Sequence, residues 1–379
     1  MKSLLPYLFC PLLFLPLALF GQKGPEFSGQ ISVWGSYNPD QELNMFYGGR
    51  YLPELAYSVG KEDSQQVAIE ISGNVFGNAF VRPFDTAATS ASIRPYRAFV
   101  RYSTPQTELR VGLQKISFGS AAILRPLMWF DQIDPRDPLQ ITNGVWGVLG
   151  RHYFLNNANV WVWVLQGNDQ PKGWESLGSN GSTPEFGGRF QYPVKQGEIA
   201  LSAHRRVVNA EHLGLNIPTP DRVAENRIGL DGKWDLKVGL WFEASYTQKA
   251  RPVGLLTNQL ATNVGIDYTF GIGNGLNVRA EQLTFAFGET REDLFVGSTL
   301  VAGTLSYPFG MFATLSGVVY YDWTNEALFN FLNYQYQFPA FSLNVMGYWN
   351  PQNTQLIQQN EGANPFGGKG VQIMLVFNH

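Results

Sequence analysis

Short segments in which apolar and polar residues alternate follow one another along most of this 379-residue chain. In one of them, Val264, Ile266 and Tyr268 alternate with Gly265 and Asp267. A period of two residues is typical of a β-strand with one apolar and one polar face. Because a shift of one residue would move every polar group to the other face, the pattern also predicts which way each strand faces.

The alternation predicts eighteen strands, and the connections between them are short and long in turn, as in the turn 104–106 and the loop 119–143. The predicted strands are 27–37, 46–59, 66–77, 92–103, 107–118, 144–155, 158–168, 184–193, 198–208, 222–234, 238–248, 259–271, 276–287, 294–307, 312–323, 328–338, 341–350 and 369–378. Barrels that span a membrane have short turns on one side and longer loops on the other. We therefore predict an all-β fold, a transmembrane antiparallel β-barrel of sixteen to eighteen strands with eighteen preferred, and both termini in the periplasm.

For two predicted strands the sequence does not decide which face is the apolar one, and two long connections differ in composition from the strands. In 158–168, Trp161 and Trp163 compete with the valines beside them for the apolar face, and in 328–338 both faces carry apolar residues. Residues 169–183 and 351–368 are rich in Gly, Asn, Gln, Ser and Pro, which predicts solvated loops. No strong internal repeat or low-complexity linker divides the chain, so residues 22–379 are predicted to form one barrel domain.

The first twenty-one residues differ from the rest of the chain. Lys2 precedes an apolar stretch from Leu4 to Phe20, and the small residue Gly21 ends it. This pattern predicts a cleavable signal peptide, residues 1–21. An N-terminal membrane anchor is the alternative, although three prolines make a poor spanning helix. Cys10, the only cysteine, lies in this stretch, so the mature chain is expected to have no disulfide and no cysteine-based metal site.

Composition narrows the class of protein. Charged residues make up 15% of the chain and aromatic residues 14%, and no apolar stretch after residue 21 is long enough for a spanning helix. Low charge with many aromatics suits a barrel in contact with outer-membrane lipid, whereas a soluble β-sandwich is the alternative. The net charge of −3 gives no reason to expect a nucleic-acid partner. We predict the cell outer membrane of a Gram-negative bacterium as the location.

The end of the chain bears on assembly. The last predicted strand ends in Phe377-Asn378-His379, so its aromatic residue is third from last. Outer-membrane barrels often end in an aromatic residue that the barrel assembly machinery reads. This machinery is therefore an expected partner, while the pattern is equally compatible with a plain final strand. The sequence allows an oligomer and does not fix its size.

The loop 119–143 is the longest and the third of the long loops. It carries large apolar residues, including Leu124, Leu127, Trp129 and Phe130, among charged ones. A freely solvated loop rarely carries so many large apolar groups. We predict that this third loop folds into the lumen, with packing against another chain or an extracellular cap as the alternative.

The approach to this loop carries a resemblance to a known family. The run Arg110-Val-Gly-Leu-Gln114, the pair Phe118-Gly119 and the run Asp131-Gln-Ile-Asp134-Pro-Arg-Asp137-Pro138 resemble the signature of alginate-export-type and related outer-membrane porins. The resemblance implies a passive diffusion barrel for anionic or saccharide solutes. Leu113 stands where that family is expected to have Arg, which puts the transfer of a substrate in doubt.

Strand parity places several arginines on the inner face ahead of this loop, where guanidinium groups could bind carboxylate or phosphate bidentately. Aspartates of the loop could face them and set up a transverse field, or the same charges could pair and hold the loop in place. The candidate pore-lining or solute-binding residues are Arg97, Arg101, Arg110, Gln114, Arg125, Asp131, Asp134, Arg136, Asp137 and Arg151.

Other chemistry finds little support. The three loop aspartates could ligate Ca²⁺, but their spacing does not match an EF-hand, so neither a metal nor a cofactor is predicted. The four histidines form no recognisable arrangement with a nucleophile, and the chain is not expected to be an enzyme. We predict a porin for passive diffusion of small hydrophilic solutes. The alternative is a non-transporting barrel that acts as a surface adhesin or complex subunit.

Overall fold

The computed structural model describes residues 24–61, 64–210, 221–352 and 366–379, so the predicted signal peptide lies outside the described residues. The described chain forms eighteen strands. They are β1 (Glu26–Tyr37), β2 (Met45–Gly60), β3 (Gln66–Val81), β4 (Ala87–Ser103), β5 (Thr107–Gln114), β6 (Val145–Tyr153), β7 (Asn159–Leu165), β8 (Glu185–Val194), β9 (Gly197–Asn209), β10 (Arg222–Asp235), β11 (Gly239–Lys249), β12 (Asn258–Phe270), β13 (Leu276–Gly288), β14 (Phe295–Phe309), β15 (Ala313–Asp322), β16 (Ala327–Gln337), β17 (Phe341–Trp349) and β18 (Lys369–Asn378).

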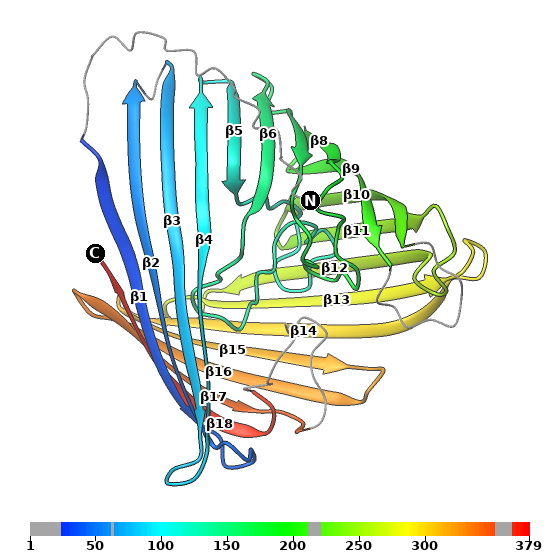
Figure 1. The fold of residues 1–379 in the computed structure, drawn as a ribbon. Helices are drawn as coiled ribbons and strands as arrows, with labels where there is room; N and C mark the ends of the chain where they lie inside the picture. The colour runs from blue at the N-terminus through cyan, green and yellow to red at the C-terminus, as the bar shows by residue number, and fades with distance from the viewer. Residues whose placement is uncertain (1–23, 62–63, 211–220, 353–365) are drawn as a thin grey trace, which may run out of the picture.

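The strands close into a barrel. Each strand pairs antiparallel with its neighbours in chain order, and β1 pairs with both β2 and β18. The closing seam runs from Gln30 opposite Asn378 to Tyr37 opposite Val371. Figure 1 shows the wall that results, with β1 and β18 side by side. The predicted all-β transmembrane barrel is confirmed, with the preferred number of strands. Among the described residues, no helix is long and apolar enough to cross a membrane.

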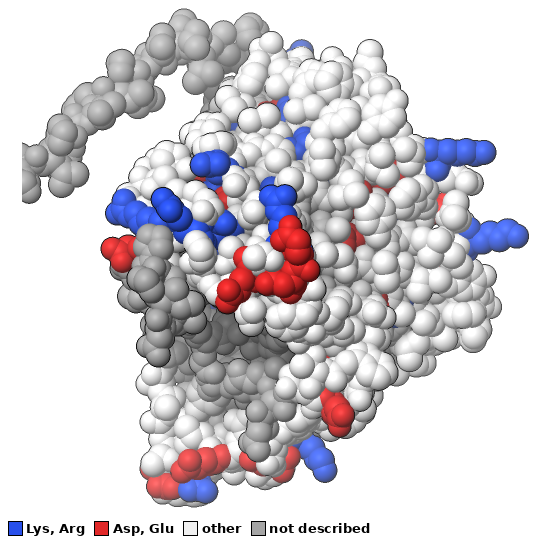
Figure 2. All heavy atoms as spheres, turned by 90° about the vertical axis from the view of Figure 1, so that its right-hand side faces the viewer, with Lys and Arg blue, Asp and Glu red and all other residues white. Residues whose placement is uncertain are grey.

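The wall has an apolar outer face. On β10, Ile228 and Leu230 are 55% and 45% exposed, whereas Arg227 and Asp231, which flank them, are 5% and 1% exposed. Exposed apolar side chains that alternate with buried polar ones are expected where a barrel meets lipid. In Figure 2, most of the visible surface is uncharged, and the charged side chains gather in a few groups.

The structure shows which face of the predicted strands 158–168 and 328–338 points into the barrel. On β7, Val162 and Val164 are 57% and 48% exposed, whereas Trp163 is buried. On β16, Phe329 and Phe331 are buried and the leucines on the other face are exposed. The large rings therefore lie on the inner face, where they pack against other parts of the chain.

A β-bulge interrupts the regular alternation of β4. Ser72 of β3 lies opposite Arg97, but Gly73 lies opposite Pro95, so Tyr96 is the extra residue. Residues directly opposite each other in an antiparallel pair share a face. Arg94, which lies opposite Asn74, is therefore on the inner face together with Arg97, although the two are three residues apart. Simple parity counted from Arg97 would have placed it outside.

Strand β5 ends at Gln114, four residues earlier than predicted. Ile116 and Phe118 leave the wall and are buried in a cluster with Trp129 and Trp163. Shortly before this exit, Gly112 has a φ of +126°, and a Cβ at this position would lie 2.2 Å from the carbonyl oxygen of Ala98. Only glycine fits here without moving the backbone of β4.

We expect Gly112→Ala to destabilise the barrel by about 1–3 kcal/mol, because alanine at this φ is strained and its Cβ would overlap β4. The measurement is urea unfolding of the protein in detergent, followed by tryptophan fluorescence. Gly150→Ala is the matched control on the neighbouring strand β6, since no heavy atom lies within 4 Å of its Cβ position. Equal stability of the two variants would contradict the argument.

Candidate functional site

The segment 115–144, between β5 and β6, is held by carboxylates of the opposite wall. Glu281 on β13 accepts hydrogen bonds from the backbone N–H groups of Ala122 (2.7 Å), Ile123 (3.1 Å) and Leu124 (2.6 Å). Glu243 on β11 accepts two more, from Ala121 (2.7 Å) and Leu127 (3.0 Å). Bonds to a charged acceptor are stronger than neutral ones. The backbone of the segment is therefore fixed by side chains more than 110 residues away in sequence.

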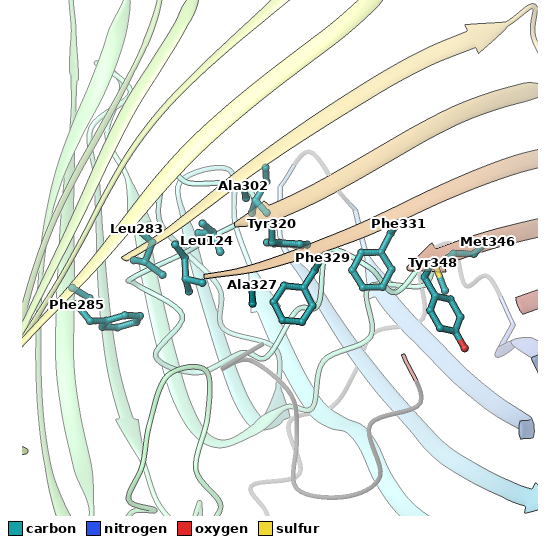
Figure 3. Packing of buried hydrophobic residues seen from close by; sticks show 13 residues of the cluster. Leu124, Leu283, Phe285, Ala302, Tyr320, Ala327, Phe329, Phe331, Met346 and Tyr348 are labelled. Carbon is teal, nitrogen blue, oxygen red and sulfur yellow. The ribbon is translucent and has the colours of Figure 1, made fainter. Parts of the chain in front are cut away.

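Apolar contacts add to these bonds. Leu124 lies among Leu283, Tyr320 and other buried residues of β12–β17, as Figure 3 shows. On the other side, Leu127 and Phe130 pack in a second cluster on β6 and β7. The segment thus contacts inner-face side chains of both β6–β7 and β12–β17. This anchoring by wall carboxylates was not expected from the sequence, which predicted arginine pairs with loop acids.

A second segment, 166–184 between β7 and β8, also contacts inner-face residues. Trp174 donates its indole N–H to the carbonyl of Arg125 (2.8 Å) and contacts Phe285, with ring centroids 5.0 Å apart. Glu175 is 7% exposed and pairs with Arg206 and Arg227. The expected solvated loop 169–183 is therefore wrong for its middle part. A tryptophan in an otherwise small and polar loop was the signal for this contact.

The acids and bases around Glu175 form a buried cluster. Arg206 (Nε) and Arg227 (Nη2) pair with Glu225 at 2.6 and 2.7 Å, and Lys249 pairs with it at 3.1 Å. All of these side chains are less than 10% exposed. Because buried charges are tolerated only when paired, the cluster has a structural role between the two segments and the wall. The space it borders is about 60 Å³, too small for a passage.

Four of the predicted site residues pair within the segment itself. Arg125 pairs with Asp131 (3.1 Å) and also donates to the carbonyl of Phe118. Arg136 forms a fork with Asp134, with contacts of 2.8 Å from Nε and 2.6 Å from Nη2. These pairs shape the segment, so Asp131 and Asp134 are not free to face arginines of the wall.

Asp137 is an acid of the segment that interacts electrostatically with a basic residue of the wall. Burial raises the pKa of Asp137, while hydrogen bonds from the N–H groups of Leu139 (2.9 Å) and Ile141 (3.5 Å) and the charge of Arg50 on β2 lower it. Arg50 of the wall and Asp137 of the segment therefore interact electrostatically without forming a salt bridge. The sequence predicted such an opposition but assigned it to other arginines.

On β5 and β6, the predicted basic residues share one acid. Glu108 pairs with Arg110 at 3.0 Å and with Arg151 at 3.2 Å. Gln114, fully buried, donates to the carbonyl of Gly147 (3.2 Å). Gln114 is thus a structural residue, and Arg110 and Arg151 are partly neutralised.

The least neutralised charges lie on β2 and β4. Arg97 stacks on Tyr96 at 3.9 Å and donates to the carbonyl of Thr142 (3.0 Å), while Arg101 lies opposite Arg110 in the register. Four inner-face arginines form no salt bridge with any residue that the structure describes, and we call them the arginine row: Arg50, Arg94, Arg97 and Arg101. An unpaired guanidinium can bind an anion without first breaking an ion pair.

Comparison with known proteins supports the fold. No family model matches the chain, and no curated protein matches it. Among solved structures, it is similar to OccAB1 of Acinetobacter baumannii (TM-score 0.55, 10% identity, 94% of this chain and 96% of that chain). It is also similar to OccK5 (OpdH) of Pseudomonas aeruginosa (0.55, 10%, 94% and 97%) and to OmpT of Vibrio cholerae (0.53, 12%, 94% and 99%). The chain therefore has the β-barrel fold of outer-membrane porins.

This fold and the apolar outer face place the protein in an outer membrane. The likeness concerns porins of several kinds and does not single out the alginate-export type, for which the motif between Arg110 and Pro138 is the support.

Proposed function

We propose that the protein is a passive channel for small hydrophilic solutes, with a preference for anions. The arginine row carries this proposal. Its four guanidinium groups form no salt bridge with any described residue and outnumber the two carboxylates, Glu54 and Glu70, that share the inner face of β2–β4, so this side of the interior has a net positive charge. A barrel of this strand number can enclose an aqueous channel. The OccAB1, OccK5 and OmpT structures supply porins of the same fold.

In this proposal, the segment 115–144 narrows the lumen. Its anchors on β11 and β13 and its apolar contacts fix its position, and the charge of Arg50 acts on Asp137. Solute would pass between the segment and β2–β4. Of the predicted site residues, Arg101 would meet the solute, and Arg110 and Arg151 would contribute weakly. Arg97, which is buried and bound to the carbonyl of Thr142, would keep the constriction in shape together with Arg125, Asp131, Asp134, Arg136 and Gln114.

The test is single-channel recording of the purified protein in a planar bilayer under a KCl gradient. We expect stable open-channel conductance and a reversal potential on the chloride-selective side. A protein that inserts, resists detergent unfolding and yet does not conduct would contradict the channel and favour the non-transporting barrel. Conductance with cation preference would contradict the role of the arginine row but leave the channel proposal standing.

A further inference from the structure

Four aromatic rings lie together on the inner face of β1, β2 and β3, close to the strand ends that carry the longer loops. We call them the aromatic track: Trp34, Phe46, Phe76 and Phe80. Phe46 stacks on Phe80 with centroids 4.4 Å apart, and Trp34 stacks on Phe76 at 5.9 Å. Exposed residues of the outer face, such as Val33 and Tyr47, alternate with them. The track therefore belongs to the interior of the barrel, and its rings are only partly buried.

The indole of Trp34 lies flat against the wall because the residue opposite it is glycine. A Cβ on Gly48 would lie 2.2 Å from Cζ2 of Trp34 and 2.3 Å from Cε2. The register confirms that Trp34 and Gly48 are directly opposite. The indole therefore lies over Gly48 of β2, and Trp34 is partly exposed on the inner face. A flat, partly exposed indole is a surface on which another ring can stack.

The aromatic track ends at the arginine row. The guanidinium carbon of Arg50 lies 4.9 Å from the ring centroid of Phe76 and 6.0 Å from that of Trp34. Arg50 forms no salt bridge with any described residue, and Arg94 lies two positions from Ser92, the partner of Phe76 in the register. A planar apolar surface thus lies beside a guanidinium group that interacts with Asp137 at longer range and forms no salt bridge among the described residues.

We propose that the aromatic track and Arg50 form a binding site for an anion that carries a flat ring, with an aromatic carboxylate as the ligand class. Its ring stacks on Trp34 and Phe76, and its carboxylate accepts hydrogen bonds from Arg50. The proposal rests on the proposed channel function and adds the solute class that the mouth retains. Sugar acids share the charge and offer a saturated ring, so they form a separate arm of the test.

The experiment measures the concentration dependence of solute-induced current blockade in single channels. Four probes separate the contributions of ring and charge: benzoate, benzamide, acetate and glucuronate. We expect benzoate to block at concentrations about three- to tenfold lower than acetate or benzamide, the range that one aromatic stack provides. Equal block by benzoate and acetate would overturn the site, and stronger block by glucuronate than by benzoate would overturn the ligand class.

Two variants test the geometry without removing the charge. Trp34→Ala removes the ring, and Gly48→Ala keeps the ring but displaces it, since the added Cβ would overlap the indole. Both should weaken block by benzoate about three- to tenfold and leave acetate unchanged. The matched controls are Tyr37→Ala, an aromatic on the outer face of the same strand, and Gly49→Ala, whose Cβ would meet its nearest atom at 3.7 Å. Wild-type affinity in both test variants would overturn the proposal.

A direct binding measurement separates this proposal from the channel function. Isothermal titration of the folded barrel in detergent with benzoate needs no conductance. Binding that depends on Trp34 and Arg50 in a protein that does not conduct would support the site and contradict the channel. Conductance without selective benzoate binding would support the channel and overturn the site.

Discussion

Removing the carboxylate of Glu281 is expected to raise the single-channel conductance about severalfold and to make the open current noisy. In the native protein, Glu281 accepts backbone hydrogen bonds from Ala122, Ile123 and Leu124, and its oxygens also meet the side-chain N–H groups of Trp241 (3.2 Å) and Asn263 (3.3 Å). Each buried donor left without a partner costs about 1–3 kcal/mol. In Glu281→Ala the start of the segment should therefore leave the wall and widen the passage.

Glu281→Gln is the graded comparison, because its amide keeps one acceptor oxygen and should give an intermediate conductance. Asp267→Asn is the matched control, because it removes a carboxylate from the neighbouring strand β12. Among the described residues, Asp267 forms only a long pair of 3.7 Å with Arg279. Retention of the heat-modifiable band on gels must accompany each measurement, so that loss of the barrel is not mistaken for widening. Unchanged conductance in a folded Glu281→Ala barrel would show that the segment does not control the passage.

Replacing Arg50 and Arg101 together with alanine is expected to lower the chloride-to-potassium permeability ratio about twofold or more. The two guanidinium groups form no salt bridge with described residues, and the charge of Arg50 acts on Asp137 of the segment. Their removal deletes positive charge from the interior, where a low-dielectric wall focuses the field. The reversal potential under a KCl gradient should move toward that of a cation-selective channel.

Two further variants make this result specific. Arg50→Lys/Arg101→Lys keeps the charge and should retain the chloride preference. Arg205→Ala removes an exposed arginine next to Asn226 on the outer face of β9 and should leave the reversal potential unchanged. If the alanine pair retains the native reversal potential, the arginines have only a structural role.

The strand number and the facing of most strands could be predicted because a period of two records which side of a wall each residue occupies. Arg94 could not, since the bulge at Tyr96 shifts the alternation and leaves no trace in a single sequence. The partners of the segment were equally hidden. Periodicity shows that Glu243 and Glu281 face inward, but not that they reach residues 121–127 from the other side of the barrel.

The candidate site was predicted in kind rather than in detail. Basic residues before a long apolar loop predicted arginines on the inner face, and the register places Arg97, Arg101 and Arg110 there. Which of them are neutralised depends on local pairs such as Arg125 with Asp131 and Arg136 with Asp134, which form inside the segment. Trp174 reached the interior from a loop whose composition indicated solvent exposure. Which charges pair, and how far a loop side chain reaches into the barrel, depend on the folded conformation of the segment. The pattern of apolar and polar residues in the sequence does not determine either.

The wall carboxylates hold the segment by its main chain, and this has a consequence for how the protein can change. Ala121, Ala122 and Ile123 are bound through their amide groups, which every residue except proline possesses. Ala121 and Ile123 are buried, whereas Ala122 is exposed, so substitutions at Ala122 can alter what a passing molecule meets while the anchoring bonds stay in place. The position of the segment's backbone is therefore independent of the side chain exposed on it, and new permeation properties can arise by point mutation without a change in the barrel.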